Sequence, residues 1–304
     1  MASPLHGLVD VFAIWTEDRR RRAPAAFRAR APAPLDCFGP LGPLPSAAPE
    51  EGPWRAPSPR PADGDREMSV VARRARGARR GTAILVPPWK VPGLGAVTGW
   101  ARLAAGAGLD VWTLVPPRHL DRAAPGIRSG EGFVSPDLGA LAAALEQLVV
   151  EVRALAQLAR ARGGEVAVVG LSLGALAAAL AAEAPDAPDA AALVAPPADL
   201  AAVIRATGIG RRYAALAARA GTPMPAEAAL APMLAPFRAD ARPRTAARAF
   251  VAAGREDRIA PAADAIALAR AWSVEPRLYP RGHLTLLFAC RAVRRDLAAF
   301  LAGA

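Results

Sequence analysis

The 304-residue chain has few of the residues that mark disulfide-rich, metal-binding or membrane-spanning proteins. Cysteine occurs only at Cys37 and Cys290, which is too few for a disulfide framework and gives no metal-ligand spacing. No apolar run reaches the roughly 18 residues that a membrane-spanning helix needs. The arginines at 19–22 follow the apolar stretch 5–15, the reverse of the order in a secretory signal. We therefore expect a cytoplasmic protein with free thiols, no metal, no cofactor and no integral membrane segment.

Lysine is almost absent, yet arginine brings the formal net charge to +11. Clustered cationic side chains would favour nucleic acid or an anionic membrane, because they attract phosphates. Here the arginines are spread from Arg19 to Arg295, no aromatic residues interleave with a basic stripe, and no zinc-finger or helix-turn-helix spacing occurs. We interpret the charge as a solvated basic surface on a globular protein and expect no nucleic-acid partner.

The chain does contain the pattern Gly-x-Ser-x-Gly, at Gly170, Ser172 and Gly174. A run of β-branched and apolar residues (166–169) precedes the pattern, and helix-forming residues (175–182) follow it. A strand that turns sharply into a helix would hold Ser172 in strained backbone geometry with its side chain projecting outward. The start of the helix would direct free N–H groups towards negative charge beside the serine. We therefore interpret Ser172 as a nucleophile and not as a capping residue.

From residue 66 on, strand patterns alternate with helical patterns, which predicts parallel strands joined by right-handed crossovers. Residues 199–244 interrupt the alternation with short helical pieces, and we expect a cap insertion (about 197–245) over the strand ends, where ligands bind. The expected strands cover 69–74 (as an edge strand), 81–86, 109–115, 165–169, 190–195, 247–252 and 274–279, and the expected helices cover 100–106, 137–162, 261–272 and 284–301.

Residues 1–65 are predicted to form a separate N-terminal part. Apolar residues at helical spacing between Leu5 and Trp15 predict a short amphipathic helix. We favour docking of this helix on the main domain over contact with a membrane or a partner, because its apolar face is short. The segment from Ala23 to Asp65 is dense in proline, which excludes a helix or a central strand. We expect an extended arm over the domain, or partial disorder.

A serine hydroxyl is a weak nucleophile unless an imidazole takes its proton and a carboxylate orients that imidazole. Two of the three histidines precede the serine motif, whereas His283 follows the last expected strand. Asp257 follows the penultimate strand, with Glu256 as the nearest competing acid. The order Ser172, Asp257, His283 at three separate strand ends therefore predicts a catalytic triad.

The segments 170–174, 254–261 and 282–283 resemble the α/β-hydrolase superfamily, and the resemblance covers roughly residues 68–304. It implies an α/β fold with a mostly parallel, eight-stranded sheet flanked by helices. It also implies Ser172 as nucleophile, His283 as general base and then acid, and Asp257 as the orienting acid. An oxyanion hole would follow from the backbone N–H of Leu173 and a second N–H from the loop after Val86.

That loop departs from the family pattern, because it reads Pro87-Pro88-Trp89-Lys90 where many members carry His-Gly. Proline has no N–H, so the second donor would be Trp89 or Lys90. The run 84–89, together with 257–261, is similar to polyhydroxyalkanoate synthases, which use cysteine at the position of Ser172. The local similarity is compatible with hydrolysis of a thioester or a polyester. Because this chain has serine in place of that cysteine, polymerase activity is only an alternative.

These observations predict a serine hydrolase that cleaves a small-molecule carboxylic ester or thioester through an acyl-enzyme. The alternatives are an acyltransferase of polyhydroxyalkanoate-synthase type and a catalytically silent binding protein of the same fold. Apolar residues in the expected cap favour an apolar acyl group. Arg118 and His119, at the end of the strand 109–115, are candidates for binding a substrate carboxylate or phosphate, although they could equally face water. Substrate identity and oligomeric state stay open.

Overall fold

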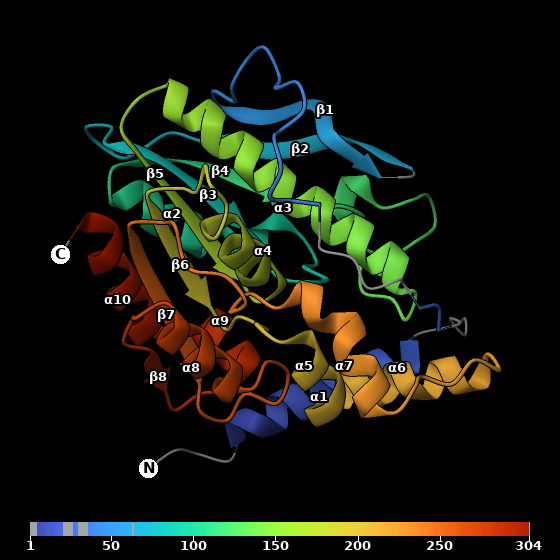
Figure 1. Cartoon of the computed structure of the whole chain (residues 1–304). Helices are drawn as coiled ribbons and strands as arrows, with labels where there is room; N and C mark the ends of the chain where they lie inside the picture. Colours follow the sequence, from blue (N-terminus) through green and yellow to red (C-terminus); the bar gives the residue numbers. More distant parts are fainter. Residues whose placement is uncertain (1–4, 21–26, 30–35, 63, 304) are drawn as a thin grey trace.

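A computed structural model describes residues 5–20, 27–29, 36–62 and 64–303. Its eight strands form one sheet in the order β1-β2-β4-β3-β5-β6-β7-β8 (Figure 1). Strand β2 pairs antiparallel with β1 and β4, and every other pair is parallel, which confirms the predicted fold class. The strands are Gly52–Ala62 (β1), Asp65–Arg73 (β2), Gly81–Val86 (β3), Leu109–Val115 (β4), Glu165–Leu171 (β5), Ala190–Val194 (β6), Arg248–Gly254 (β7) and Arg277–Tyr279 (β8).

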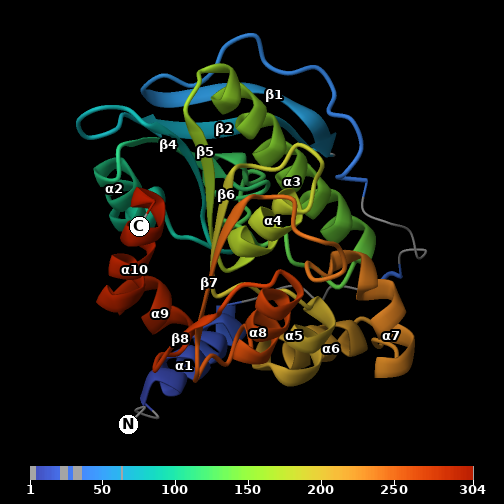
Figure 2. The same ribbon diagram turned by 60° about the vertical axis from the view of Figure 1, so that its left-hand side comes forward.

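Helices cover both faces of this sheet (Figure 2). One face carries α3 (Leu138–Ala161), α4 (Leu173–Ala182) and α8 (Ala262–Ala271). The other face carries α2 (Thr98–Gly106), α9 (His283–Ala289) and α10 (Arg291–Ala302). Because the central strands are covered on both sides, every residue of β3, β4 and β6 is buried. The unbroken apolar runs of the sequence follow from this layering.

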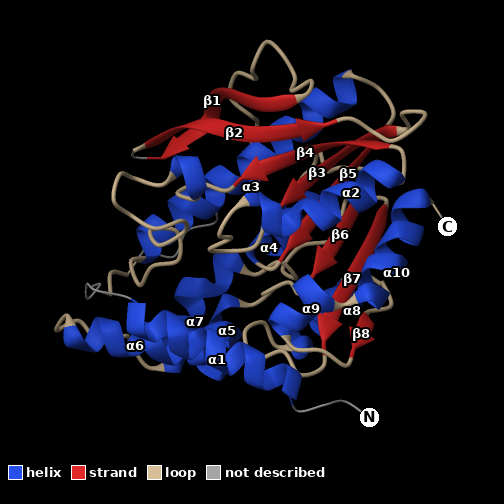
Figure 3. Ribbon diagram, turned by 180° about the vertical axis from the view of Figure 1, so that it is seen from behind, coloured by secondary structure: helices blue, strands red, loops and turns tan. Residues whose placement is uncertain are grey.

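A separate group of helices lies beyond the carboxyl ends of the parallel strands (Figures 1 and 3). The segment between β6 and β7 contributes α5 (Leu200–Ala206), α6 (Gly208–Arg219), α7 (Glu227–Leu234) and a 3₁₀ turn, Ala235–Phe237. Helix α1 (Leu5–Arg20) lies beside them and contacts α6 and α9. The cap and the N-terminal helix therefore occupy the edge of the sheet where ligands bind in open α/β folds.

Strand β1 forms the edge of the sheet, so the prediction of residues 69–74 as an edge strand was wrong. It pairs with β2 from Gly52 opposite Ala72 to Pro57 opposite Glu67, within the segment expected as an arm or partly disordered. Four residues of β1 are proline (53, 57, 59 and 61), which an edge strand tolerates because one of its sides has no partner strand that needs an N–H donor. Residues 52–62 of the predicted N-terminal part therefore belong to the same sheet as the strands of the main domain. Pro32 and Pro34 lie outside the described residues.

The helix predicted over 284–301 is interrupted in the structure. Helix α9 ends at Ala289, Cys290 has an extended backbone (φ −87°, ψ 106°), and α10 begins at Arg291. The break lets both short helices direct apolar side chains into one core cluster, with Leu286 and Leu287 from α9 and Val293, Leu297 and Leu301 from α10. Neither glycine nor proline marks the break, which is why periodicity alone predicts a continuous helix.

Three further observations bear on the expected class of protein. In the part of the chain that the structure describes, no helix is both long and apolar enough to cross a membrane. The same residues contain no group of three or more histidine, cysteine and acidic side chains that could hold a metal ion. Cys37 and Cys290 are buried free thiols.

Candidate active site

Ser172 lies at the turn between β5 and α4. Its backbone angles are φ 52° and ψ −116°, a region that residues other than glycine rarely adopt. The N–H of Ser172 donates to the carbonyl oxygen of Val194 on β6 at 2.9 Å, which ties the strained turn to the sheet. The serine therefore has the backbone geometry that the Gly-x-Ser-x-Gly pattern predicts.

Gly170 and Gly174 permit this turn because no side chain fits at either position. A Cβ on Gly170 would overlap the carbonyl oxygen of Gly174, and a Cβ on Gly174 would overlap the carbonyl oxygen of Val86. The second close approach brings the start of α4 against the loop that follows β3. The two loops that could stabilise negative charge beside the serine are thus adjacent.

His283 lies between Ser172 and Asp257. Its Nε2 is 2.8 Å from Ser172 Oγ, and its Nδ1 is 2.7 Å from Asp257 Oδ2. A carboxylate can only accept a hydrogen bond, so Nδ1 carries the proton and Nε2 is free to accept the serine proton. The three side chains follow β5, β7 and β8, and the structure brings them together as the sequence order predicts.

The second oxygen of Asp257 is held by its own loop. Oδ1 accepts hydrogen bonds from the N–H groups of Ile259 at 2.8 Å and Ala260 at 2.7 Å. These bonds orient Oδ2 towards the imidazole ring. The carboxylate of Glu256 has no hydrogen-bond partner among the described residues. Asp257, and not its neighbour, is therefore the acid that pairs with His283.

The surroundings of His283 favour its charged form. Burial lowers the pKa of the imidazole, but the charge and hydrogen bond of Asp257 and the charge of Asp10 outweigh it. The net effect raises the pKa above the ordinary value of 6.5. A ring in this environment can hold a proton taken from Ser172 more readily than an isolated imidazole.

Two backbone N–H groups near Ser172 are unpaired. Those of Leu173, the first residue of α4, and Trp89, in the loop after β3, have no hydrogen-bond partner among the described residues. The N–H of Lys90 instead donates to Nε2 of His119 at 3.1 Å. Of the two donors that the sequence left open in this loop, Trp89 is therefore available and Lys90 is engaged.

His119 is buried behind this loop and acts as an acceptor for it. Its Nδ1 is 2.8 Å from the carbonyl oxygen of Pro117, so Nδ1 carries the proton and Nε2 accepts from Lys90. Burial, together with the charges of Arg122 and Lys90, lowers the pKa of His119 to about 4 against the opposing bond to Pro117. The neutral ring thereby supports Lys90, whose backbone is in the left-handed region (φ 57°).

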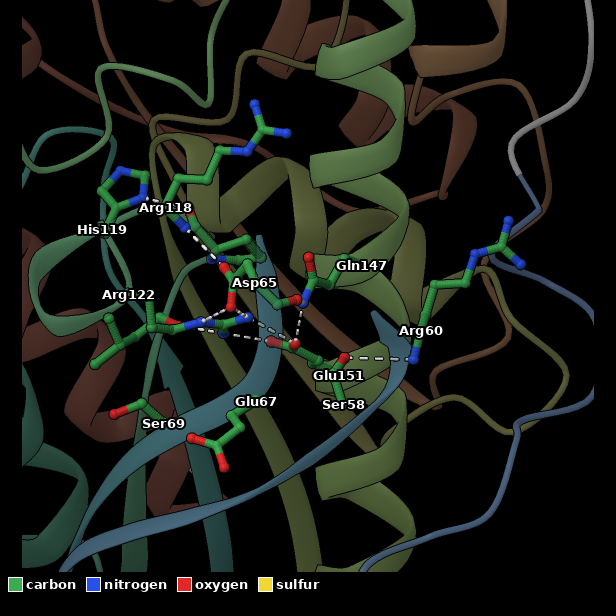
Figure 4. A network of polar contacts seen from close by, with 12 residues as sticks. Ser58, Arg60, Asp65, Glu67, Ser69, Arg118, His119, Arg122, Gln147 and Glu151 are labelled. Carbon is green, nitrogen blue, oxygen red and sulfur yellow. Dashed lines mark hydrogen bonds and ion pairs between the residues drawn. The ribbon is translucent and has the colours of Figure 1, made fainter. Parts of the chain in front are cut away.

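A buried ion cluster holds the segment that carries His119 (Figure 4). The guanidinium of Arg122 binds both oxygens of Glu151, at 2.7 and 2.9 Å, and Oδ1 of Asp65 at 3.0 Å. Desolvation raises the pKa of Glu151 despite this cation, which reflects how deeply the pair is buried. The cluster joins α3 to β2 and to the segment that follows β4.

Arg118 and His119 contact the protein and do not line the cavity at Ser172. The N–H of Arg118 donates to Asp65 Oδ2 at 3.0 Å, and its side chain donates to the carbonyl oxygen of Gly132 at 2.5 Å. Their predicted substrate-binding role gains no support from these contacts. A histidine that follows a strand can support a neighbouring loop as well as a substrate, and the sequence does not distinguish the two.

Ser172 and His283 border a cavity of about 260 Å³. Its walls come from α1, the loop after β3, the cap helix α6, the Asp257 loop and α9. The lining is mainly apolar, with Ala13, Pro88, Trp89, Val91, Pro92, Ile209, Tyr213, Ile259, Leu284, Leu287 and Phe288. Lys90, the only lysine of the chain, and Arg212 are the cationic residues of the lining. Sequence reasoning missed the α1, α6 and α9 residues, although the apolar spacing of those helices could have suggested an inward face.

A second, smaller cavity of about 60 Å³ adjoins the first. Both cavities are lined by Ile209 and Tyr213, which form their common wall. The hydroxyl of Tyr213 donates to the carbonyl oxygen of Val134 at 2.9 Å and so fixes the aromatic ring. Leu173, next to the serine, also lines the second cavity, together with Leu141, Leu145, Leu176, Ile204 and Met224. An apolar space therefore lies on either side of Tyr213.

No known family model matches the chain, and no curated protein matches its sequence. Solved structures match its fold. They include an acetyl xylan esterase from Paenibacillus sp. R4 (14% identity over 98% of this chain and 94% of that chain, TM-score 0.58). An esterase from Pyrococcus furiosus is 14% identical over 86% of this chain and 98% of that chain, with a TM-score of 0.55. A monoacylglycerol lipase from Paleococcus ferrophilus is 17% identical over 77% of this chain and 98% of that chain, with a TM-score of 0.54. At these identities the similarity concerns the fold.

Proposed function

We propose that this chain, which has the α/β-hydrolase fold, is a serine hydrolase that cleaves carboxylic esters through an acyl-enzyme. The observation that carries the proposal is the continuous hydrogen-bonded chain from Ser172 Oγ through His283 to Asp257, with distances of 2.8 and 2.7 Å. A serine in strained backbone geometry, paired with a base and an orienting acid beside a cavity, is the arrangement that acyl transfer needs.

In the first half of the proposed reaction, Ser172 Oγ attacks the ester carbonyl carbon while its proton moves to His283 Nε2. The carbonyl oxygen becomes negatively charged, and the unpaired N–H groups of Leu173 and Trp89 are the donors that we assign to it. The imidazolium then gives its proton to the leaving alcohol oxygen as the carbon–oxygen bond breaks. The acyl group stays on the serine.

In the second half, water takes the place of the alcohol. His283 accepts a proton from the water, the resulting hydroxide attacks the acyl carbon, and the imidazolium returns the proton to Ser172 Oγ. Asp257 holds the ring in one tautomer through both halves, because its Oδ2 accepts from Nδ1. The free acid leaves and the original hydrogen-bonded chain is restored.

The cavity favours a substrate with an apolar group. Its lining is mainly hydrocarbon and aromatic, and burial of apolar substrate surface contributes roughly 25 cal/mol per Å². The second cavity beside Leu173 would accommodate an extension of the acyl chain past Tyr213. We therefore expect esters of apolar acids to be cleaved faster than acetyl esters.

Thioesters can follow the same path, because a thiolate is also expelled from the tetrahedral intermediate. Acyl transfer of polyhydroxyalkanoate-synthase type would differ only in the second half, where a hydroxyl of a growing chain would replace water. Incubation with a hydroxyacyl thioester distinguishes the two outcomes: free acid supports hydrolysis, and polymer supports transfer.

The test of the proposal is labelling with a fluorophosphonate, which reacts with serines activated by a neighbouring base, followed by turnover of esters of increasing chain length. Wild-type protein should be labelled, and Ser172→Ala should lose both labelling and turnover while staying folded. The matched control is Ser135→Ala, which removes a serine that lines the second cavity and should leave labelling intact. Folded wild-type protein that is neither labelled nor active would overturn the proposal in favour of a binding module.

A further inference from the structure

A second buried carboxylate lies behind the loop of His283. Asp10, on α1, is fully buried, and its carboxylate accepts three backbone hydrogen bonds. The donors are the N–H groups of His283 at 2.7 Å, Leu284 at 3.0 Å and Arg258 at 3.2 Å. The first two begin α9, and the third follows Asp257 in sequence. A single side chain from the N-terminal helix therefore joins the loop of the base to the loop of the acid.

The contact between α1 and this loop requires glycine at position 282. A Cβ there would overlap the carbonyl oxygen of His6 and would lie 2.7 Å from Asp10 Oδ2. On the same helix, one turn after Asp10, Ala13 lines the cavity at Ser172. The inward face of α1 thus contacts both the loop of the imidazole and the space that the substrate would occupy.

Asp10 also affects the charge balance around the imidazole. Burial raises the pKa of the Asp10 carboxyl, its three N–H donors lower that pKa, and the nearby Asp257 raises it, with a net rise. The negative charge of Asp10 in turn raises the pKa of His283, in addition to the effect of Asp257. Two carboxylates from different elements therefore favour a proton on this ring.

Other charged groups lie around the same loop. Arg281, which follows β8, contacts Nε2 of His6 on α1 at 3.2 Å, and Arg258 follows Asp257. On the cavity side, Lys90 from the loop after β3 and Arg212 from α6 line the space next to His283. Two cations thus line the cavity next to His283, whereas the carboxylates of Asp257 and Asp10 accept hydrogen bonds from the ring and from the backbone of its loop.

We propose that Asp10 is a positioning residue of the active site, which holds the His283 loop against α1 and places a second negative charge behind the imidazole. This inference rests on the proposed function. When the serine O–H bond breaks and an N–H bond forms at Nε2, the ring becomes positively charged, and Asp10 stabilises that state together with Asp257. Asp10 does not line the cavity, so its removal should lower kcat without a comparable change in KM.

The test is Asp10→Asn in the full-length chain, followed by NMR titration of histidines labelled with ¹³C at Cε1. The chain has three histidines, and the variants His6→Gln and His119→Gln assign the signals. The substitution keeps the size of the side chain and removes its charge. The titration midpoint of His283 should fall by roughly one pH unit. With an ester substrate, kcat should fall roughly tenfold and KM should stay within about twofold.

The matched control is Glu256→Gln, which removes one negative charge from the residue before Asp257, where the carboxylate has no hydrogen-bond partner among the described residues. The midpoint of His283 should stay close to the wild-type value in this variant. If Asp10→Asn fails to fold, Asp10→Ser provides a smaller uncharged acceptor for the same titration.

A lower melting temperature of Asp10→Asn with an unchanged His283 midpoint and unchanged kcat would overturn the proposal, because Asp10 would then only dock α1. The titration needs no substrate, so it separates the two proposals. A shifted midpoint in a protein that cleaves no ester would leave the positioning of His283 in place and count against the proposed function.

Discussion

His283 contacts Ser172 and His119 contacts the loop after β3, and the pKa values of these two buried histidines shift in opposite directions. His283 has the carboxylates of Asp257 and Asp10 near it, and these outweigh its burial and raise its pKa above 6.5. His119 is buried beside the cations Arg122 and Lys90, and its pKa falls to about 4. The comparison teaches that burial lowers the pKa of both imidazoles, and that only nearby carboxylates, as at His283, reverse this effect.

The hydrogen bonds of the two rings also differ. Both rings donate from Nδ1, His283 to a carboxylate and His119 to a carbonyl oxygen. At Nε2, His283 meets a serine hydroxyl whose proton can be transferred, whereas His119 accepts from the backbone N–H of Lys90, which keeps its proton. One ring is therefore suited to move a proton, and the other is suited to hold a loop.

The largest effect should come from His283→Ala, which removes the proposed base. Turnover of an ester should fall by about a thousandfold or more, because Ser172 would lose the group that takes its proton. The measurement is kcat under saturating substrate, with circular dichroism and a melting temperature as controls for folding. A folded variant that retains a tenth or more of the wild-type kcat would contradict the assignment of His283 as base.

The substitution Arg122→Met removes one of the two cations near His119. The substitution leaves Asp65 and Glu151 buried without their common counter-charge, which should lower the free energy of unfolding by about 3–5 kcal/mol. Urea unfolding at pH 7 measures the loss. The matched control is Arg55→Met, which breaks ion pairs to Asp121 and Glu67 made by half-exposed side chains and should cost less than about 1 kcal/mol. Equal losses in the two variants would show that the buried cluster contributes no more to the free energy of unfolding than the half-exposed ion pairs do.

His119→Ala should affect catalysis far less than His283→Ala. The variant leaves the N–H of Lys90 without its acceptor, so the loop that presents Trp89 can shift, and kcat should fall roughly ten- to a hundredfold. His119→Gln can return an acceptor to Lys90 and should recover part of the loss. If kcat of His119→Ala equals that of the wild type, the loop does not depend on this ring.

The smallest effects concern pH. A raised pKa means that His283 stays protonated to a higher pH than an ordinary histidine, and a protonated ring cannot accept the serine proton. The acid limb of kcat/KM should therefore have its midpoint above pH 6.5, and activity should fall as the pH drops through that midpoint. Initial rates between pH 5 and 9, with stability checked at each pH, test this. A midpoint below 6.5 would contradict the environment described for the ring.

The lowered pKa of His119 should make the stability of the protein depend on pH. Its folded-state pKa of about 4 lies below the ordinary 6.5, so between these values the unfolded chain binds a proton that the folded chain does not. The stability due to neutral His119 is present above pH 6.5 and is lost as the pH falls towards 4. Urea unfolding at pH 7 and pH 5 should show a larger loss for the wild type than for His119→Gln, and equal losses would contradict it.

The features that could be predicted from the sequence are those that depend on neighbouring residues. The turn at Ser172 needs small residues two positions before and after it, and the alternation of strands and helices is a pattern of local apolar spacing. The placement of Asp257 and His283 after the last two strands follows from that alternation, because the carboxyl ends of parallel strands meet at one edge.

Other features were beyond the sequence because their partners are remote. The prolines of β1 argued against a helix or a central strand, and only the pairing with β2 shows that this segment is the edge strand of the sheet. The break at Cys290 follows from packing of α9 and α10, since neither glycine nor proline marks it. Nothing in the run Pro87-Pro88-Trp89-Lys90 shows which N–H is engaged, because the acceptor is His119, 29 residues away.

By itself, the sequence determined the strained serine turn, the parallel sheet and the order of the three residues along the chain, since each depends on backbone preferences and apolar spacing within a few positions. Only the tertiary structure decided that the N–H of Lys90, and not that of Trp89, donates to His119, that His119 supports a loop and does not line the cavity, and that Asp10 reaches the His283 loop across 273 positions of sequence. The physical reason is that hydrogen bonds and charges act over a few ångströms in space, and the chain brings such groups together only when it folds.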